Sequence, residues 1–372
     1  MARLLSRPGL VSAGLIAGTS LGAGIFALPY LASSAGIVQV ALYLLVLGAL
    51  VTYAHTLYWR VLRDQPAETH LLELVRVHFS AGAAKATFIA TILGLVFTLS
   101  AYLVLGSTFA ASILGLSIPY ALLLFWAACS LPLLLRLRRL VQVELAVTAL
   151  LGLLIIVLFA TVPVSLARFP TGGWAFSLIP FGPILFALAG WTAIEPALAA
   201  VRGRRGYRRI ALGWGTGLVA VSYVLFALSL GSAGDPVTTD TISGVLHLPG
   251  WQVGALFALG LAAIVTSYLP MILEVKNAFR RGLGWPRSWA FPVAVFLPYL
   301  LVLAGFDSFL SSLELVGGVF LAAQYVAILQ VCRRALRLRG AERIAADIVS
   351  AAFALAALLH IAYFVAPYLG LG

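Results

Sequence analysis

One apolar stretch, from about Leu10 to Ser33, contains the segment Gly18-Thr19-Ser20-Leu21-Gly22-Ala23-Gly24-Ile25-Phe26-Ala27-Leu28-Pro29. Each glycine within a helix costs about 1 kcal/mol relative to alanine. Backbone groups left unpaired in hydrocarbon cost more, so an irregular segment is tolerated only when it lines a cavity or is buried in protein. The segment therefore predicts a membrane helix that is broken near Thr19 to Gly24.

The polar groups of such a break have a defined chemistry. The amides of Gly22, Ala23 and Gly24 would open a new half-helix, whose positive N-terminus suits an anion such as a carboxylate. The carbonyl groups freed before the break suit an ammonium group or a small cation. The alternative is that the glycines only allow neighbouring helices to pack closely.

The composition supports a membrane protein. Of the 372 residues, 62% are hydrophobic and only 10% are charged, which excludes an ordinary soluble domain. At roughly 20 residues for each crossing, the apolar residues suffice for about 11 helices. The formal net charge of +12 would suggest nucleic acid in a soluble protein, but basic residues also gather on the cytoplasmic side of membrane helices. We predict an all-α polytopic membrane protein with no nucleic-acid partner.

Polar, proline and glycine breaks divide the chain into eleven spans. The first and sixth spans contain the interrupted segments, and the eleventh is the extra helix. The approximate spans are 10–33, 36–62, 84–114, 119–135, 142–164, 178–201, 210–230, 251–275, 288–305, 306–331 and 343–367.

The basic residues test this division independently. If the N-terminus lies in the cytoplasm, all 24 Lys and Arg residues except Arg168 fall on the cytoplasmic side. The positive-inside rule therefore predicts a cytoplasmic N-terminus and an extracytoplasmic C-terminus, in the plasma (cytoplasmic) membrane.

A second interruption occupies the sixth span, within Phe186-Ala187-Leu188-Ala189-Gly190-Trp191-Thr192-Ala193-Ile194-Glu195-Pro196. Paired breaks at matching positions are typical of transporters built from inverted repeats. We predict a single transporter domain over 1–372, with repeat one at about 8–165 and repeat two at about 176–332. An extra helix follows at about 343–367.

The two broken segments, together with Thr266-Ser267-Tyr268-Leu269 in the eighth span, resemble the aromatic and hydroxy amino acid permease family. That family belongs to the amino acid, polyamine and organocation superfamily. The resemblance implies a leucine-transporter-type fold with five plus five inverted helices and the first and sixth helices broken. It also implies alternating access and symport of an amino acid with a proton or a sodium ion.

The resemblance further implies a substrate site and a cation site. The substrate carboxylate would lie at Gly22 and Gly24, and a sodium ion would lie at the hydroxyl groups of Thr266 and Ser267. In some proton-coupled relatives a lysine in the fifth span replaces that ion, but this sequence has no lysine there, so the coupling ion stays open. The implied substrate-binding residues are Thr19, Ser20, Gly22, Ala23, Gly24, Ser100, Tyr102, Ala189, Gly190 and Trp191.

Four acidic residues fall within the spans, where charges are costly and so suggest function. Glu195 is a candidate for proton carriage or for closing the cytoplasmic path, with a structural ion pair as the alternative. Glu314 is a candidate partner for a substrate amine or a gate. Glu144 and Glu274 lie nearer the cytoplasmic edge, where pairing with Arg139 or Lys276 is the expected role.

The leading hypothesis is a secondary amino acid transporter coupled to a cation, for a neutral or aromatic amino acid. The alternative is a channel or a non-transporting membrane sensor with the same fold. The sequence has no metal-ligand cluster, phosphate loop or nucleophile motif, so we expect no enzymatic activity and no cofactor. The expected partners are the amino acid and membrane lipid, with no obligate protein partner.

Overall fold

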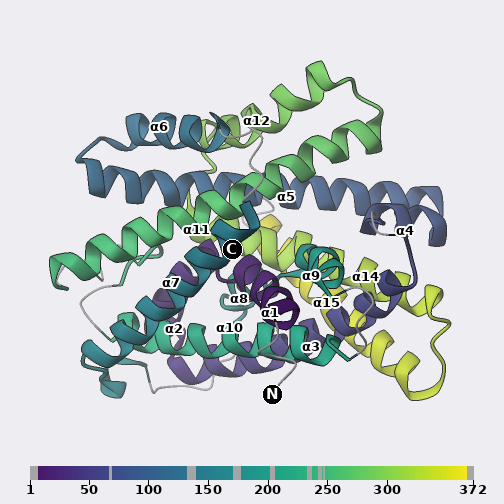
Figure 1. Cartoon of the computed structure of the whole chain (residues 1–372), viewed down its shortest axis with the longest axis horizontal. Helices are drawn as coiled ribbons and strands as arrows, with labels where there is room; N and C mark the ends of the chain where they lie inside the picture. The colour runs from purple at the N-terminus through teal and green to yellow at the C-terminus, as the bar shows by residue number, and fades with distance from the viewer. Residues whose placement is uncertain are drawn as a thin grey trace.

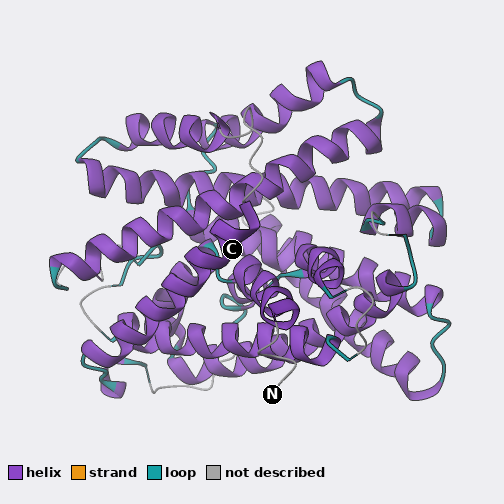
Figure 2. Ribbon diagram, viewed as in Figure 1, coloured by secondary structure: helices purple, strands orange, loops and turns teal. Residues whose placement is uncertain are grey.

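The computed structural model describes residues 7–66, 69–131, 140–170, 177–201, 206–232, 237–241, 245 and 248–366. Within these ranges the regular secondary structure is entirely helical, and no strand occurs (Figure 2). The predicted all-α class is therefore confirmed. Helix is the expected solution for an apolar chain, because it pairs every backbone group within the segment.

The helices follow one another with short connections (Figure 1). The α-helices are α1 (Arg7–Ser20), α2 (Leu28–Ala35), α3 (Ile37–Arg63), α4 (Leu71–His78), α5 (Ala81–Leu114), α6 (Ile118–Ser130), α7 (Leu140–Thr161), α8 (Phe181–Leu188), α9 (Ile194–Ala200), α10 (Arg208–Gly231), α11 (Gly250–Asn277), α12 (Arg287–Leu303), α13 (Phe309–Leu315), α14 (Ala322–Ala335) and α15 (Gly340–Val365). Short 3-10 segments are η1 (Ala23–Ala27), η3 (Leu166–Arg168) and η4 (Trp191–Ala193). The π-helical segments are η6 (Ala278–Gly282) and η7 (Val316–Leu321).

Eight helical stretches among the described residues are long and apolar enough to cross a membrane, and two of them, Phe181–Ala200 and Phe309–Ala335, each contain several of the elements named above. A ninth span results if the pair Pro8–Ser20 and Ala23–Ala35 counts as one. This pair is bent by 47° at its break. Two further apolar helices, α6 and α12, are shorter than that test requires. The predicted number of eleven spans stays a prediction.

The two interrupted segments occupy the centre of the molecule (Figure 1). The first, α1 with η1 and α2, packs against α10, α9 and η4, and the second, α8 with α9, packs against α3, η1 and η7. Helix α5 packs against α11, and helix α3 packs against α10. These two pairs flank the centre (Figure 1). The broken helices are thus enclosed by continuous ones, which meets the requirement that irregular backbone be kept from lipid.

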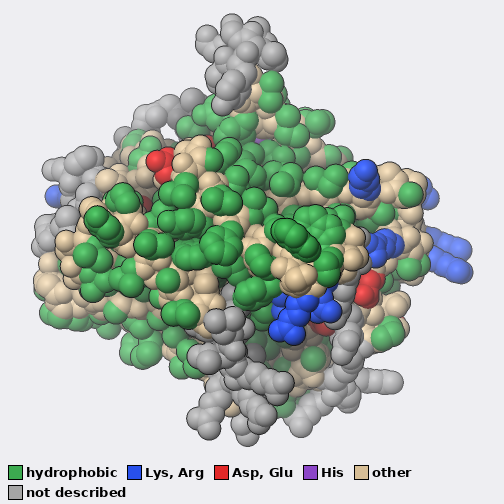
Figure 3. All heavy atoms as spheres, turned by 90° about the horizontal axis from the view of Figure 1, so that it is seen from above, with side chains coloured by type: hydrophobic (Ala, Val, Ile, Leu, Met, Phe, Trp, Pro, Cys, Tyr) green, Lys and Arg blue, Asp and Glu red, His purple; other side chains and the backbone are tan. Residues whose placement is uncertain are grey.

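The outer surface separates apolar from basic residues. Figure 3 shows hydrophobic side chains over most of one face, with Lys and Arg gathered mostly toward its right-hand end. Basic residues occur in the last turns of several helices. They include Arg60 and Arg63 on α3, Lys276 on α11, and Arg333 and Arg334 on α14. This gathering is what the positive-inside rule expects, while the membrane side that this end faces stays a prediction.

Two glycines, Gly182 on α8 and Gly317 in η7, allow these two elements to approach closely. A Cβ atom on Gly317, in η7, would lie 1.7 Å from the carbonyl oxygen of Gly182 on α8. No side chain fits there without moving the backbone. This contact fixes the position of α8, which leads directly into the second break.

We expect Gly317→Ala to destabilise the protein by about 1–3 kcal/mol, because overpacking at a rigid contact forces the backbone to shift. The thermal unfolding midpoint in detergent would measure it. Gly254→Ala is the matched control, since a Cβ atom at that α11 position meets nothing within 4 Å. Equal midpoints for the two variants would contradict the proposed contact.

Candidate substrate and cation site

The two helix breaks lie side by side. Between α1 and η1 the break comprises Leu21 and Gly22, and between α8 and η4 it comprises Ala189 and Gly190. A Cβ atom on Gly24 would lie 2.8 Å from the Cα atom of Ala187, so the two backbones touch. Both predicted breaks are confirmed, and the tertiary structure brings them into contact.

One tyrosine side chain links the two interrupted segments. The hydroxyl group of Tyr223, on α10, donates to the carbonyl oxygen of Ser20 at 2.5 Å and lies 2.7 Å from the carbonyl oxygen of Ala187. Tyr223 is fully buried. On the other side of the first break, the hydroxyl group of Thr241 donates to the carbonyl oxygen of Phe26. Side chains from neighbouring segments thus donate hydrogen bonds to backbone carbonyl groups on both sides of the first break.

The second break is held by α14 and α3. The indole nitrogen of Trp191 donates to the side-chain oxygen of Gln324 at 2.9 Å. The hydroxyl group of Tyr325 lies 2.9 Å from Nε2 of His55 and hydrogen-bonds to the backbone of Gly190. Sequence reasoning missed Gln324 and Tyr325, although a glutamine within an apolar span is a usable signal.

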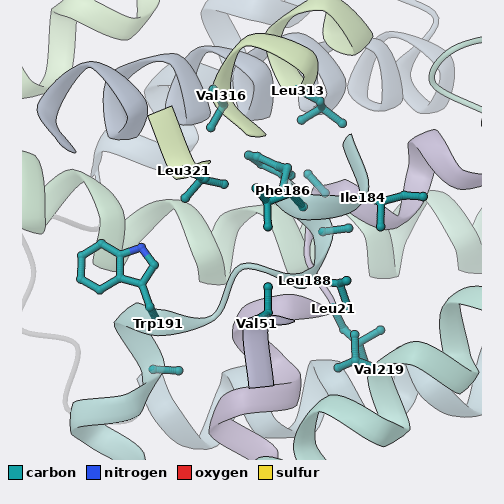
Figure 4. Packing of buried hydrophobic residues seen from close by; sticks show 14 of the residues in the cluster. Leu21, Val51, Ile184, Phe186, Leu188, Trp191, Val219, Leu313, Val316 and Leu321 are labelled. Atoms are coloured by element: carbon teal, nitrogen blue, oxygen red, sulfur yellow. The ribbon is translucent and has the colours of Figure 1, made fainter. Parts of the chain in front are cut away.

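A small uncharged cavity opens between the two breaks. Seven of the predicted substrate-binding residues line it, and none of the described lining residues is charged. Apolar walls come from Leu95, Phe186, Met271 and Leu321, and Figure 4 shows Phe186 and Leu321 close together, with Trp191 at the side. The predicted residues that line the cavity are Thr19, Ser20, Gly22, Gly24, Tyr102, Ala189 and Trp191.

Three other predicted substrate residues do not line the cavity. The hydroxyl group of Ser100 lies 3.1 Å from the carbonyl oxygens of both Val96 and Pro298, so it faces α12. The reason is helical periodicity, because residues four apart share a face whereas residues two apart do not. The α5 residues that line the cavity are Gly94, Leu95, Thr98 and Tyr102.

The other two substrate predictions fall on the buried contact between the breaks. Ala23 is fully buried, and a Cβ atom on Gly190 would lie 3.0 Å from Oγ of Ser20. Both adjoin residues that line the cavity, but neither Ala23 nor Gly190 lines it.

The predicted cation residues are scattered. The hydroxyl group of Ser267 hydrogen-bonds to that of Tyr102, and its Oγ atom would lie 3.4 Å from a Cβ atom on Gly22. Ser267 therefore adjoins the first break, whereas the hydroxyl group of Thr266 donates to the carbonyl oxygen of Ala263 on its own helix. The backbone of Glu314 packs on Gly182, outside the central cavity.

A second cavity, of about 160 Å³, adjoins the first toward the basic end of the molecule. Leu95, Trp191, Thr192 and Met271 line both cavities and form the partition between them. Glu195 lies in the second cavity, where its carboxylate is 3.1 Å from Nδ1 of His70. A structural pair, the alternative role given for Glu195, is thus present, with a partner from the connection before α4; its proposed role in proton carriage or in closing the cytoplasmic path stays a prediction.

The depth of Glu144 in the membrane stays a prediction, but its surroundings are more specific than the sequence indicates. Glu144 lies in the first turns of α7 but is buried, and its carboxyl group hydrogen-bonds to Thr19 at the end of α1. A Cβ atom on Gly18 would lie 3.3 Å from its Oε1 atom. Its expected partner Arg139 lies outside the described residues. The sequence pattern alone did not reveal that α7 packs against the first break.

Known proteins were compared with this sequence and structure. No family model and no curated protein matches the sequence. The structure resembles that of MhsT in complex with L-phenylalanine, with a TM-score of 0.70 and 16% identity over 95% of this chain and 99% of that one. The fold is of the leucine-transporter type.

Two other solved structures agree. A manganese transporter from Eremococcus coleocola has a TM-score of 0.68 and 13% identity, covering 96% of this chain and 87% of that one. A Na⁺-coupled sialic acid symporter has a TM-score of 0.61 and 14% identity, covering 98% of this chain and 91% of that one. Together with the apolar helices, these neighbours identify an integral membrane protein. The predicted permease family stays a resemblance.

We expect Tyr223→Phe to lower the free energy of unfolding by about 1–3 kcal/mol, because carbonyl groups in both interrupted segments lose a buried donor. Thermal unfolding in detergent would measure the loss. Tyr120→Phe is the control, since Tyr120 is 71% exposed. A Tyr223→Phe protein as stable as this control would argue against the bridge.

The His70 and Glu195 pair predicts a pH effect. The hydrogen bond to Glu195 raises the pKa of His70 above its usual 6.5. The stabilisation from this pair is therefore fully present below the unfolded pKa and is lost as the pH rises through the raised value. NMR titration of the His70 ring should show a lower pKa in Glu195→Gln. Asp347→Asn, remote from this cavity and paired with Arg333, should leave the pKa unchanged, and equal pKa values in all three proteins would refute the pair.

Proposed function

We propose that this protein is a secondary active transporter that carries a neutral or aromatic amino acid together with a cation, by alternating access. The single observation that carries the proposal is the uncharged cavity between two touching helix breaks. Backbone at helix breaks offers donors and acceptors without a charged side chain, and an amino acid zwitterion needs both. MhsT, which shares the fold, was crystallised with L-phenylalanine.

In this proposal the zwitterion lies across the first break. Its carboxylate meets the N-terminal amides of the half-helix that begins at Ala23, next to Gly22 and Gly24. The amide of Gly22 itself donates to the carbonyl oxygen of Ser20, so the amides beyond it are the available donors. The ammonium group meets carbonyl oxygens at Thr19, Ser20 and Ala189.

The walls of the cavity favour an apolar side chain. Leu95, Phe186, Met271 and Leu321 supply most of the apolar surface, and Trp191 is held at its edge by Gln324. A charged side chain would be desolvated there without a described partner of opposite charge, which is costly. This argument supports a neutral substrate, with the aromatic class favoured by the ring of Trp191.

The proposed coupling ion is a proton or sodium. Ser267 is the best placed of the predicted cation residues, because its hydroxyl group adjoins both Tyr102 and Gly22. Thr266, Glu195 and Glu314 complete the proposed set. The protein would sit in the plasma membrane with its N-terminus in the cytoplasm, in contact with lipid and the amino acid, and without enzymatic activity or a cofactor.

We expect proteoliposomes of the protein to show counterflow, in which unlabelled internal amino acid accelerates entry of labelled external amino acid. A carrier shows this acceleration because its site is exposed to one side at a time, whereas a channel or a sensor does not. Screening neutral and aromatic amino acids would identify the substrate class. Absence of counterflow with all of them would exclude the proposed function.

We expect Gly22→Leu to abolish counterflow while the protein remains folded, because a Cβ atom there has room but a larger side chain enters the cavity. Gly254→Leu, on the open face of α11, is the matched control and should transport normally. Folding of both variants is checked by thermal unfolding in detergent. Normal counterflow by Gly22→Leu would show that the site is elsewhere.

A further inference from the structure

The carboxyl group of Glu144 lies behind the first break. Glu144 is only 8% exposed. Its helix, α7, packs directly on α1, α10 and α11. Gly18 leaves the space that this side chain occupies, since a Cβ atom on Gly18 would meet Oε1 of Glu144 at 3.3 Å and Oγ1 of Thr148 at 2.9 Å. Glu144 is therefore a buried acid built against the end of α1.

Among the described residues, the carboxyl group of Glu144 forms no ion pair. The charged side chains described on α10 and α11 include Arg208, Arg209, Glu274 and Lys276, and none of them pairs with it. Tyr102, on α5, is near enough to Glu144 to interact with it electrostatically, and α1 contributes the hydroxyl group of Thr19. A carboxylate buried without a cation is costly, so uptake of a proton relieves that cost.

The hydroxyl group of Thr19 has two hydrogen-bond partners but only one hydrogen to donate. It lies 2.9 Å from the carbonyl oxygen of Leu15, which can only accept, and it also contacts the Glu144 carboxyl group. Both bonds can form together only when Glu144 carries a proton and donates to Thr19. When Glu144 is ionised, Thr19 must turn its hydrogen to the carboxylate and give up Leu15.

We propose that Glu144 is the proton-binding residue of this protein, and that its protonation state changes the substrate cavity through the hydrogen bonding of Thr19. One proton from water adds to the carboxylate and removes one negative charge, and its release reverses both changes. Thr19 lines the central cavity, so the exchange of its hydrogen bond alters a wall of the proposed substrate site. This inference rests on the proposed function and names a proton as its coupling ion.

The test compares three variants in proteoliposomes. Glu144→Gln should keep counterflow, which needs no net proton movement, but should lose accumulation of substrate driven by a pH gradient. Glu144→Asp, which keeps a carboxyl group, should retain part of that accumulation. Asp347→Asn, which alters an acid that is paired with Arg333 and lies outside the proposed substrate and cation site, should still accumulate substrate. Accumulation that survives in Glu144→Gln, or that is lost equally in Asp347→Asn, would overturn the proposal.

A second measurement does not depend on transport. Infrared difference spectra of the purified protein across a pH titration should contain the carbonyl band of a protonated carboxylic acid, and part of this band should vanish in Glu144→Gln. An unchanged band would overturn the assignment of the proton to Glu144. If the wild-type protein shows no counterflow, the proposed function fails, whereas the infrared result still decides whether Glu144 binds a proton.

Discussion

The rest of the structure depends on how the buried hydroxyl group of Tyr223 meets the carbonyl oxygens of both Ser20 and Ala187. A helix that breaks within a membrane leaves polar backbone groups that lipid cannot satisfy. Here two broken helices are placed in contact, and a single buried hydroxyl group from α10 serves both. Backbone groups that would be energetically costly in lipid thus form the polar surface of a cavity.

The same constraint explains why glycine recurs at the centre. Gly24 lets the backbone of the first segment touch Ala187, and Gly317 lets η7 touch Gly182 on α8. These contacts position the second break without using side chains, and so leave the space between the breaks to the proposed substrate. The apolar residues around it, such as Leu21, Leu188 and Val219, pack beside the breaks (Figure 4).

Charged groups lie outside the central cavity. No charged residue lines that cavity among those described, the second cavity holds the His70 and Glu195 pair, and Glu144 lies behind the wall that Thr19 forms. A buried acid with no cation partner among the described residues is expensive in a low dielectric. That cost is the reason to assign a proton to Glu144, whereas the partly exposed carboxylate of Glu195 is paired with His70.

The linear pattern of apolar residues and glycines was sufficient to predict the all-helical class and the two breaks, because these depend on local hydropathy and backbone freedom. The family resemblance then named seven of the residues that line the cavity, but also Ser100, which faces α12 because packing sets the rotation of α5 about its axis. Neither could find Tyr223, Gln324 or Tyr325 as partners of the breaks, or the packing of Glu144 against the end of α1. Which helices face each other depends on contacts between residues more than a hundred positions apart, and only the tertiary structure specifies those.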